Sequence, residues 1–127
     1  MHHLDTSLLI DALTGERRSA RRLRAAIESG ERIALSCLVL YEWLRGPRLE
    51  SEIEAQEALF PRARAAPFGP AEAEVAAVLC RSALHPRGRD IDLAVAATAL
   101  THSARVWTLN PDDFRDIPGL SLYAPDK

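Results

Sequence analysis

The segment from Arg89 to Leu100 constrains the fold more than any other part of the chain. Apart from two acids near its start, it is almost wholly apolar and rich in alanine. A helix of this composition is normally buried all round, and its small side chains would let it press closely against a sheet. The acids, Asp90 and Asp92, are the anomaly, because a buried carboxylate is costly unless it is paired or bound to a metal.

The position of the two acids decides which of them suits a metal ligand. At the N-terminus of a helix, the macrodipole and the free N–H groups favour an ionised carboxylate. Side chains two residues apart on a helix point roughly 200° away from each other, so both cannot face one metal. We expect Asp92, inside the first turn, to be the inward ligand, and Asp90 to be an N-cap or a supporting acid.

Strands alternate with helices along the chain. The patterning predicts helices over residues 6–13, 16–29, 37–45, 48–60, 70–84 and 89–100, with a brief helix in 110–114. It predicts strands over residues 2–5, 32–35, 105–109 and 120–123, and a weak strand around 64–68. This order is typical of an α/β fold whose mostly parallel sheet carries helices on both faces. We expect one domain over residues 1–127.

Composition excludes several classes of protein. The chain has 127 residues, 47% of them apolar, but no apolar run long enough to span a bilayer and no signal peptide, so we expect a cytoplasmic protein. A net charge of −2 gives no global basic field for nucleic acid. Cys37 and Cys80 are too isolated for a disulfide framework or a zinc site, and we expect both to be small buried thiols.

One local cluster of arginines stands out against this weakly acidic background. A solvated helix face would explain it, and so would a face that contacts phosphates or a partner protein. Its members are Arg17, Arg18, Arg21, Arg22 and Arg24.

Several polar residues are expected to converge at one end of the sheet. In open α/β sheets, sites form beyond the carboxyl ends of the strands. Asp5 ends the first strand, Asn110 follows the strand that ends at Leu109, and Asp92 opens the helix that enters the sheet layer. Glu42 is the only charge in an otherwise apolar helical stretch, where either an exposed face or a site would account for it.

Carboxylates without cysteine or a nearby histidine favour a hard cation. Asp5, Asp92 and Glu42 would suit Mg²⁺ or Mn²⁺, which proteins hold through a few carboxylates and several waters. Such an ion lowers the pKa of a bound water and offsets charge that develops on a phosphoryl oxygen. Phosphodiester hydrolysis is therefore the expected chemistry.

Four segments, taken in order, resemble the motifs of one family. The third is the most specific, and the resemblance extends over nearly the whole length of the chain. They are Leu4–Ser7 (similar to "LDTS/N"), Ser36–Gly46 ("S…V.E…G"), Asp92–Ala99 ("DxxIAATA") and Trp107–Phe114 ("T.N/D…DF"). The chain thus resembles PIN-domain proteins, specifically the VapC-type toxins of bacterial toxin–antitoxin pairs.

The resemblance implies roles for individual residues. Asp5 and Asp92 match the metal-binding acids of the family, and Glu42 matches its second acid. Asn110 stands where many relatives carry a fourth Asp, which is a departure because an amide adds no negative charge. Either Asp113 supplies the missing carboxylate, or the site works with three acids.

The resemblance also implies the wider function. It implies a three-layer α/β/α PIN sandwich and a Mg²⁺- or Mn²⁺-dependent endoribonuclease that acts as a toxin. Thr6, Ser7 and Thr108 match polar positions that orient carboxylates or phosphate. A cognate antitoxin, an RNA substrate and a homodimer are the implied partners.

Two other functions fit parts of the sequence. Asp5 could be the nucleophile of a phosphoryl-transfer enzyme, but such folds usually need another acid two residues on, where this chain has Ser7. The second alternative is a catalytically degenerate module that binds RNA or a partner, which the amide of Asn110 would favour.

Overall fold

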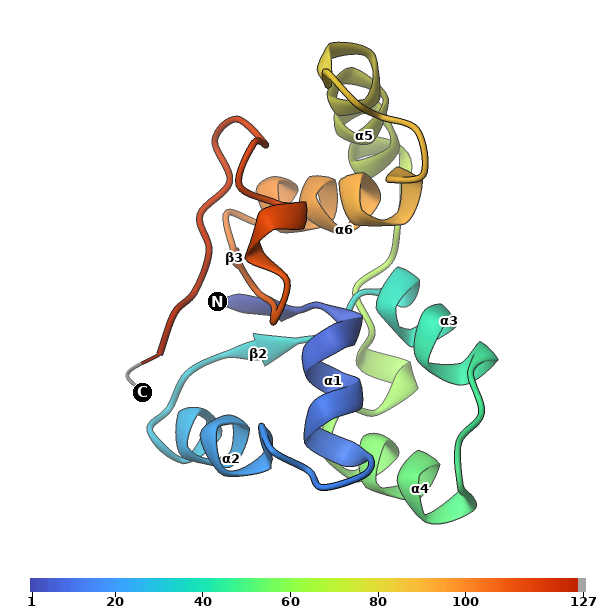
Figure 1. Cartoon of the computed structure of the whole chain (residues 1–127), viewed down its shortest axis with the longest axis vertical. Helices are drawn as coiled ribbons and strands as arrows, with labels where there is room; N and C mark the ends of the chain where they lie inside the picture. The colour runs from blue at the N-terminus through green and yellow to red at the C-terminus, as the bar shows by residue number, and fades with distance from the viewer. Residues whose placement is uncertain (126–127) are drawn as a thin grey trace.

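A three-stranded parallel sheet forms the centre of the computed structural model, which describes residues 1–125. The strands are β1 (His2–Leu4), β2 (Ile33–Ala34) and β3 (Arg105–Trp107), in the order β2-β1-β3. The chain leaves β1 for β2 on one side and later returns to β3 on the other (Figure 1). The strand order therefore reverses at β1, and α/β sheets bind ligands at such a point, beyond the carboxyl ends of the strands.

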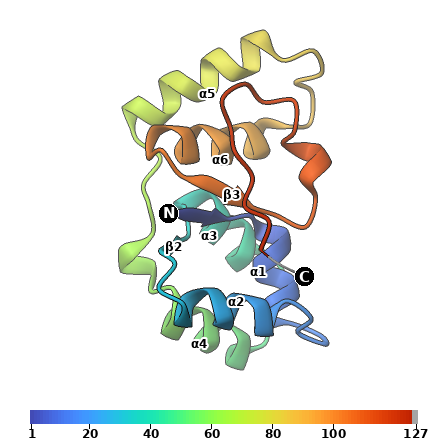
Figure 2. The same cartoon turned by 90° about the vertical axis from the view of Figure 1, so that its left-hand side faces the viewer.

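Helices cover both faces of the sheet, as predicted. Helices α5 and α6 lie on one side, and α1, α2, α3 and α4 lie on the other (Figure 2). Their bounds are α1 Thr6–Leu13, α2 Ala20–Glu28, α3 Cys37–Arg45, α4 Glu50–Leu59, α5 Pro70–Ser82 and α6 Asp90–Thr101, with 3-10 turns η1 Arg62–Arg64 and η2 Pro111–Asp113. Within residues 1–125, no helix combines the length and the apolar character needed to cross a bilayer.

Helix α6 is the buried helix that the sequence predicted. Every residue from Leu93 to Ala99 is buried, and the helix packs mainly against α5 and also contacts β3 and α3. Its one buried hydroxyl, Thr98, donates to the carbonyl of Ala94 at 2.9 Å, so no polar group is left unpaired inside the helix. This packing holds the first turn of α6 at the carboxyl end of the sheet.

Helix α3 follows its predicted bounds. Ser36 caps it, with its Oγ accepting the N–H of Val39 at 3.1 Å. Val39 and Trp43 are buried in the core, whereas Tyr41 is 55% exposed. The expectation that both cysteines are buried was wrong: Cys37 is exposed at the start of α3, and Cys80 is only partly buried.

Helix α2 begins four residues later than the sequence pattern suggested. The residues before it form a turn in which Gly15 and Arg17 have φ values of 58° and 53°. A residue with positive φ interrupts a right-handed helix. The Ser19 hydroxyl then donates to Asp11 Oδ2 at 2.5 Å, which ties the turn back to α1.

Two of the predicted strands shrink to single bridges. Around residues 64–68 the chain forms η1 and then one bridge between Ser36 and Ala66. The segment 120–123 joins the sheet only through a bridge between Val106 and Leu122. Helix α4 also begins at Glu50, two residues later than predicted.

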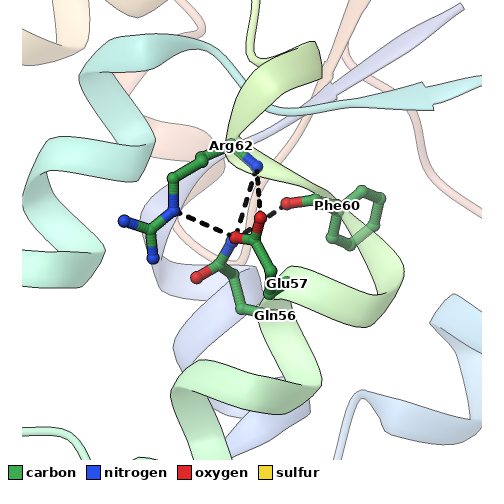
Figure 3. A network of polar contacts seen from close by, with 4 residues as sticks. All are labelled: Gln56, Glu57, Phe60 and Arg62. Atoms are coloured by element: carbon green, nitrogen blue, oxygen red, sulfur yellow. Dashed lines mark hydrogen bonds and ion pairs between the residues drawn. The ribbon is translucent and has the colours of Figure 1, made fainter.

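A small polar network fixes the end of α4 and its turn into η1 (Figure 3). Buried Gln56 donates from Nε2 to the carbonyl of Phe60 at 2.9 Å. Glu57 accepts from the Arg62 side chain at 3.2 Å and from its backbone N–H at 3.3 Å. The network orients the connector that returns to the sheet beside Ser36.

Two histidines, His3 and His102, contact each other away from the carboxyl end of the sheet. His3 is fully buried in β1, and its Nε2 lies 3.2 Å from Nδ1 of His102, which follows α6. Burial, together with the charges of His102 and the N-terminus, lowers the pKa of His3 to about 4. His3 is therefore neutral in the folded protein near neutral pH.

We predict that His3 makes the protein lose stability as the pH falls. Its folded pKa of about 4 lies below its ordinary value of 6.5, so stability is complete above 6.5 and is lost progressively toward 4. A shift of this size sets an upper bound of ~3 kcal/mol. Urea unfolding at pH 7.5 and pH 5 measures the change.

The His3→Gln variant should show a smaller loss over this pH interval, because its side chain does not titrate. His85→Gln, which changes an exposed histidine, should behave like the unsubstituted protein. An identical loss in His3→Gln and the unsubstituted protein would contradict the assignment.

Candidate functional site

Asp5 lies immediately after β1 and is only 6% exposed. Its Oδ2 accepts two hydrogen bonds, from Ser7 Oγ at 2.9 Å and from Thr108 Oγ1 at 2.8 Å. The two hydroxyls come from α1 and from the residue after β3, so Asp5 connects these two segments. Paired donors on one oxygen hold the carboxylate in a single orientation.

The backbone after β3 fixes these hydroxyls in turn. The N–H of Leu109 donates to Ser7 Oγ at 3.1 Å, and the N–H of Asn110 donates to Thr108 Oγ1 at 2.9 Å. Each hydroxyl therefore accepts from the backbone and donates to Asp5. The other oxygen of Asp5 accepts no hydrogen bond from a described side chain.

Glu42 reaches the same end of the sheet from α3. Thr6, the first residue of α1, donates from Oγ1 to Glu42 Oε1 at 2.6 Å. Arg45 Nη2 lies 3.6 Å from Glu42 Oε2, and the Glu42 side chain is 20% exposed. Of the two interpretations left open by the sequence, the structure places Glu42 with the converging acids.

Asp92 carries the clearest electrostatic signature of the site. Burial, followed by the negative charges of Asp5, Asp113 and Glu42, raises its pKa to about 6, while Arg89 opposes the shift. Carboxylates that follow β1 and that lie on α3 and η2 are therefore close enough to Asp92 to act on its charge. This is the convergence that the sequence predicted for Asp5, Asp92 and Glu42.

Asp90 does not have the capping place considered for it. Arg89 occupies the N-cap position of α6, and Asp90 is the first helical residue, exposed and without a capping hydrogen bond. Within the helix it still lies near the site, because it lines a cavity of about 330 Å³ with Glu42, Arg45 and Asp92. Its expected place beside the ligands stays a prediction.

The structure separates Asn110 from Asp113. Asp113 lies near enough to Asp92 to raise the pKa of that carboxyl. Asn110 lines a groove along α1, and its backbone N–H donates to Thr108 Oγ1. Asp113 is thus a carboxylate near Asp92, and its place as the fourth acid stays a prediction.

Two arginines near the acids escaped the sequence analysis. Arg89 binds both carboxylate oxygens of Asp116, at 2.8 and 2.7 Å, and donates to the carbonyl of Asp113 at 2.9 Å. It thereby ties the η2 segment to the start of α6. Arg45 lies beside Glu42 within a motif that was noticed for its acid alone. An arginine within three residues of a candidate acid is the signal that could have identified both.

The donor set fits a hard divalent cation. Within residues 1–125, no three His, Cys, Asp or Glu side chains already enclose an ion position. Magnesium is usually bound by one or two carboxylates, with waters and substrate phosphates completing the shell, so a full protein cage is not required. Burial and the neighbouring acids disfavour the ionised form of Asp92, and a bound cation would favour that form.

Comparison with known proteins agrees with this arrangement. The PIN domain matches residues 3–120. The chain belongs to the PIN-domain family. It is also 36% identical over 125 residues to a Mycobacterium tuberculosis protein named "Ribonuclease VapC19", covering 94% of this chain and 97% of that one.

Solved structures share the fold of this PIN domain. A chain of a toxin–antitoxin complex from Klebsiella pneumoniae is 25% identical with a TM-score of 0.73, and the match covers 100% of this chain and 99% of that one. A chain of DNA-bound VapBC from Salmonella typhimurium is 22% identical with a TM-score of 0.75, and 96% of each chain is covered. The expected α/β/α PIN sandwich is confirmed.

We predict that Asp92→Asn stabilises the protein prepared in EDTA. The folded pKa of Asp92 is raised, so its contribution is favourable at low pH and is lost as the pH rises through about 6. The shift from 3.8 to about 6 sets a limit of ~3 kcal/mol, and solvent screening at this half-exposed group reduces the expected gain to about 1 kcal/mol. Urea unfolding at pH 7.5 should show the gain, and unfolding at pH 4 should not.

Adding Mg²⁺ should stabilise the unsubstituted protein more than Asp92→Asn, because only the former keeps the full charge for the cation. Asp90→Asn, an exposed acid two residues earlier, is the matched control. Equal free energies of unfolding for Asp92→Asn and Asp90→Asn at pH 7.5 would contradict the prediction.

Proposed function

We propose that this chain is a Mg²⁺- or Mn²⁺-dependent endoribonuclease and the toxin of a toxin–antitoxin pair. The observation that carries the proposal is the cluster of Asp5, Glu42, Asp92 and Asp113 at the carboxyl end of the sheet. Burial, followed by the charges of the other three acids, raises the pKa of Asp92 to about 6. Such a cluster suits a cation and an anionic substrate that the cation bridges. The similarity to a protein named as a ribonuclease supports RNA as that substrate.

The acids and their supports have separate roles in this proposal. Asp5, Glu42 and Asp92 hold the cation, and Asp113 adds negative charge beside them. When bound, the cation activates a water and offsets the charge that develops on the phosphate. Ser7 and Thr108 hold Asp5 in one orientation, and Thr6 does the same for Glu42. The residues thus present a prepared set of oxygen ligands, so little reorganisation is needed on binding.

The alternatives have less support. A degenerate binding module was suggested by the amide of Asn110, but Asp113 provides a carboxylate within reach of the cluster. An aspartyl nucleophile at position 5 is disfavoured because such folds usually need another acid two residues on. Here that residue is Ser7, whose hydroxyl donates to Asp5 Oδ2.

A protein partner is supported by an apolar groove of about 500 Å³ between α1, α2 and α4. Leu13, Leu23, Ile27 and Leu59 line it, and the last two are 37% and 46% exposed. Arginines of the cluster on and before α2 border the groove, so an amphipathic segment with acidic flanks would suit it. We propose the cognate antitoxin as this partner.

A homodimer is the other proposed assembly. Apolar side chains are exposed on α3 and α5, with Tyr41 at 55% and Val78 at 52%. A second copy of the chain would cover such positions, because symmetric dimers bury self-complementary apolar patches.

We predict that Asp5→Asn abolishes metal-dependent RNA cleavage. Loss of residues that merely orient metal ligands typically costs 10–100-fold, so loss of a direct ligand should cost at least roughly 100-fold. Initial rates on structured RNAs with Mg²⁺ measure the change, with EDTA as the blank. Expression of the unsubstituted chain should also arrest growth, and expression of Asp5→Asn should not.

Asp112→Asn serves as the control, because it removes an exposed carboxylate that pairs only with Arg115. It should cleave like the unsubstituted protein. Full activity of purified Asp5→Asn, with contaminating nuclease excluded, would refute the assignment of Asp5.

We also predict that Thr6→Val lowers kcat/KM for RNA cleavage roughly tenfold, because Glu42 loses the hydroxyl that orients it at 2.6 Å. Thr6→Ser keeps the hydroxyl and should restore most of the activity. If Thr6→Ser were as impaired as Thr6→Val, the threonine would be acting through its methyl group and not through the hydrogen bond.

A further inference from the structure

A groove of about 360 Å³ runs from the acid cluster along α1. Ser7 and Asn110 line it at the cluster, since Ser7 donates to Asp5 and the Asn110 N–H donates to Thr108. Asp11 and Thr14 continue it along α1. A strand of RNA held at the acids would therefore place a neighbouring nucleotide over this groove.

The charge of the groove disfavours a phosphate there. Asp11, Glu16 and Arg18 line it, so acids outnumber bases. The only lining arginine is already held by a carboxylate, because Arg18 Nε lies 3.0 Å from Glu16 Oε2. An occupant that is neutral and rich in hydrogen-bond donors fits this charge better than an anion does.

Hydrogen-bond acceptors are in surplus along the groove. Asp11 Oδ2 accepts from Ser19 Oγ at 2.5 Å, and its other oxygen accepts from no described residue. Thr14 Oγ1 donates to the carbonyl of Ile10 at 2.7 Å, which leaves its lone pairs available. The free oxygen of the half-buried Asp11 carboxylate and the Thr14 hydroxyl can both accept hydrogen bonds from N–H groups of a ligand.

The walls of the groove suit a flat ring. Ile10 and Leu109 supply apolar surface on it, and Leu109 is 44% exposed. A nucleobase combines an apolar face with polar edges, and guanine alone carries an imino N–H and an amino group side by side on one edge. A carboxylate accepts both of these hydrogen bonds together. The Asn110 amide, which both donates and accepts, lies at the cluster end of the groove.

We propose that this groove is a base-recognition subsite for the nucleotide next to the scissile phosphate, with guanine preferred and Asp11 as the residue that determines specificity. Asn110 supports the same base from the cluster side, which gives this amide a role distinct from that of a metal ligand. The inference rests on the proposed function in so far as RNA is the ligand.

Binding of short RNAs tests the subsite without any need for cleavage. The probes are uridine pentamers with a single guanosine at each position in turn, measured by fluorescence anisotropy in EDTA. Guanosine at one position should raise affinity about tenfold over the all-uridine pentamer. Asp11→Asn should abolish this gain, and Asn110→Ala should reduce it.

A matched variant separates recognition from a structural role of Asp11. Ser19→Ala removes the hydrogen bond that Asp11 accepts but keeps the carboxylate, so it should retain the guanosine gain. Asp112→Asn, an exposed acid outside the groove, should retain it too. The proposal is overturned if no position shows a gain, if Asp11→Asn keeps it, or if Ser19→Ala loses it equally.

Cleavage of the same pentamers with Mg²⁺ distinguishes this inference from the proposed function. Cleavage without any guanosine gain in binding would overturn the subsite and leave the ribonuclease intact. A guanosine gain lost in Asp11→Asn, with no cleavage at any Mg²⁺ or Mn²⁺ concentration, would support the subsite and refute the nuclease.

Discussion

Burial of neighbouring carboxylates at the carboxyl end of the sheet is the constraint on which the candidate site depends. Separately, Asp5, Glu42 and Asp92 would move toward solvent, where their charges are screened. They stay together because each leaves an element that the core holds in place. Burial of Leu93 to Ala99 fixes the start of α6, and β1 fixes Asp5 at the centre of the sheet. The stability of the core thus offsets the charge excess that the proposed cation would relieve.

Hydroxyl groups hold two of these carboxylates in defined orientations. Thr6 orients Glu42, and Ser7 and Thr108 orient Asp5, with both of the latter hydroxyls held by the backbone after β3. The entropy of ordering these side chains is therefore lost when the chain folds and not when a ligand binds. Asp92 lacks such a support among the described hydrogen bonds, and burial together with the neighbouring charges raises its pKa.

Helix α1 connects the site with the two grooves beside it. Ile10, Asp11 and Thr14 line the groove that continues the acid cluster, while Ala12 and Leu13 line the apolar groove toward α2 and α4. The proposed RNA subsite and the proposed partner surface are thus separated by the width of one helix. Because both depend on α1, an occupant of one groove lies against the element that shapes the other.

The sequence by itself determined the buried α6, the parallel α/β arrangement and the candidate acids, because these follow from local periodicity and from sparse charges in apolar segments. It misplaced the start of α2, since the positive φ of Arg17 has no residue signature. It also left open Glu42 and the choice between Asn110 and Asp113. Only the tertiary structure showed that Glu42 is bonded to Thr6 and that Glu42 and Asp113 lie near Asp92. Hydrogen bonds and Coulomb interactions between residues more than twenty positions apart depend on distances that a linear pattern does not contain.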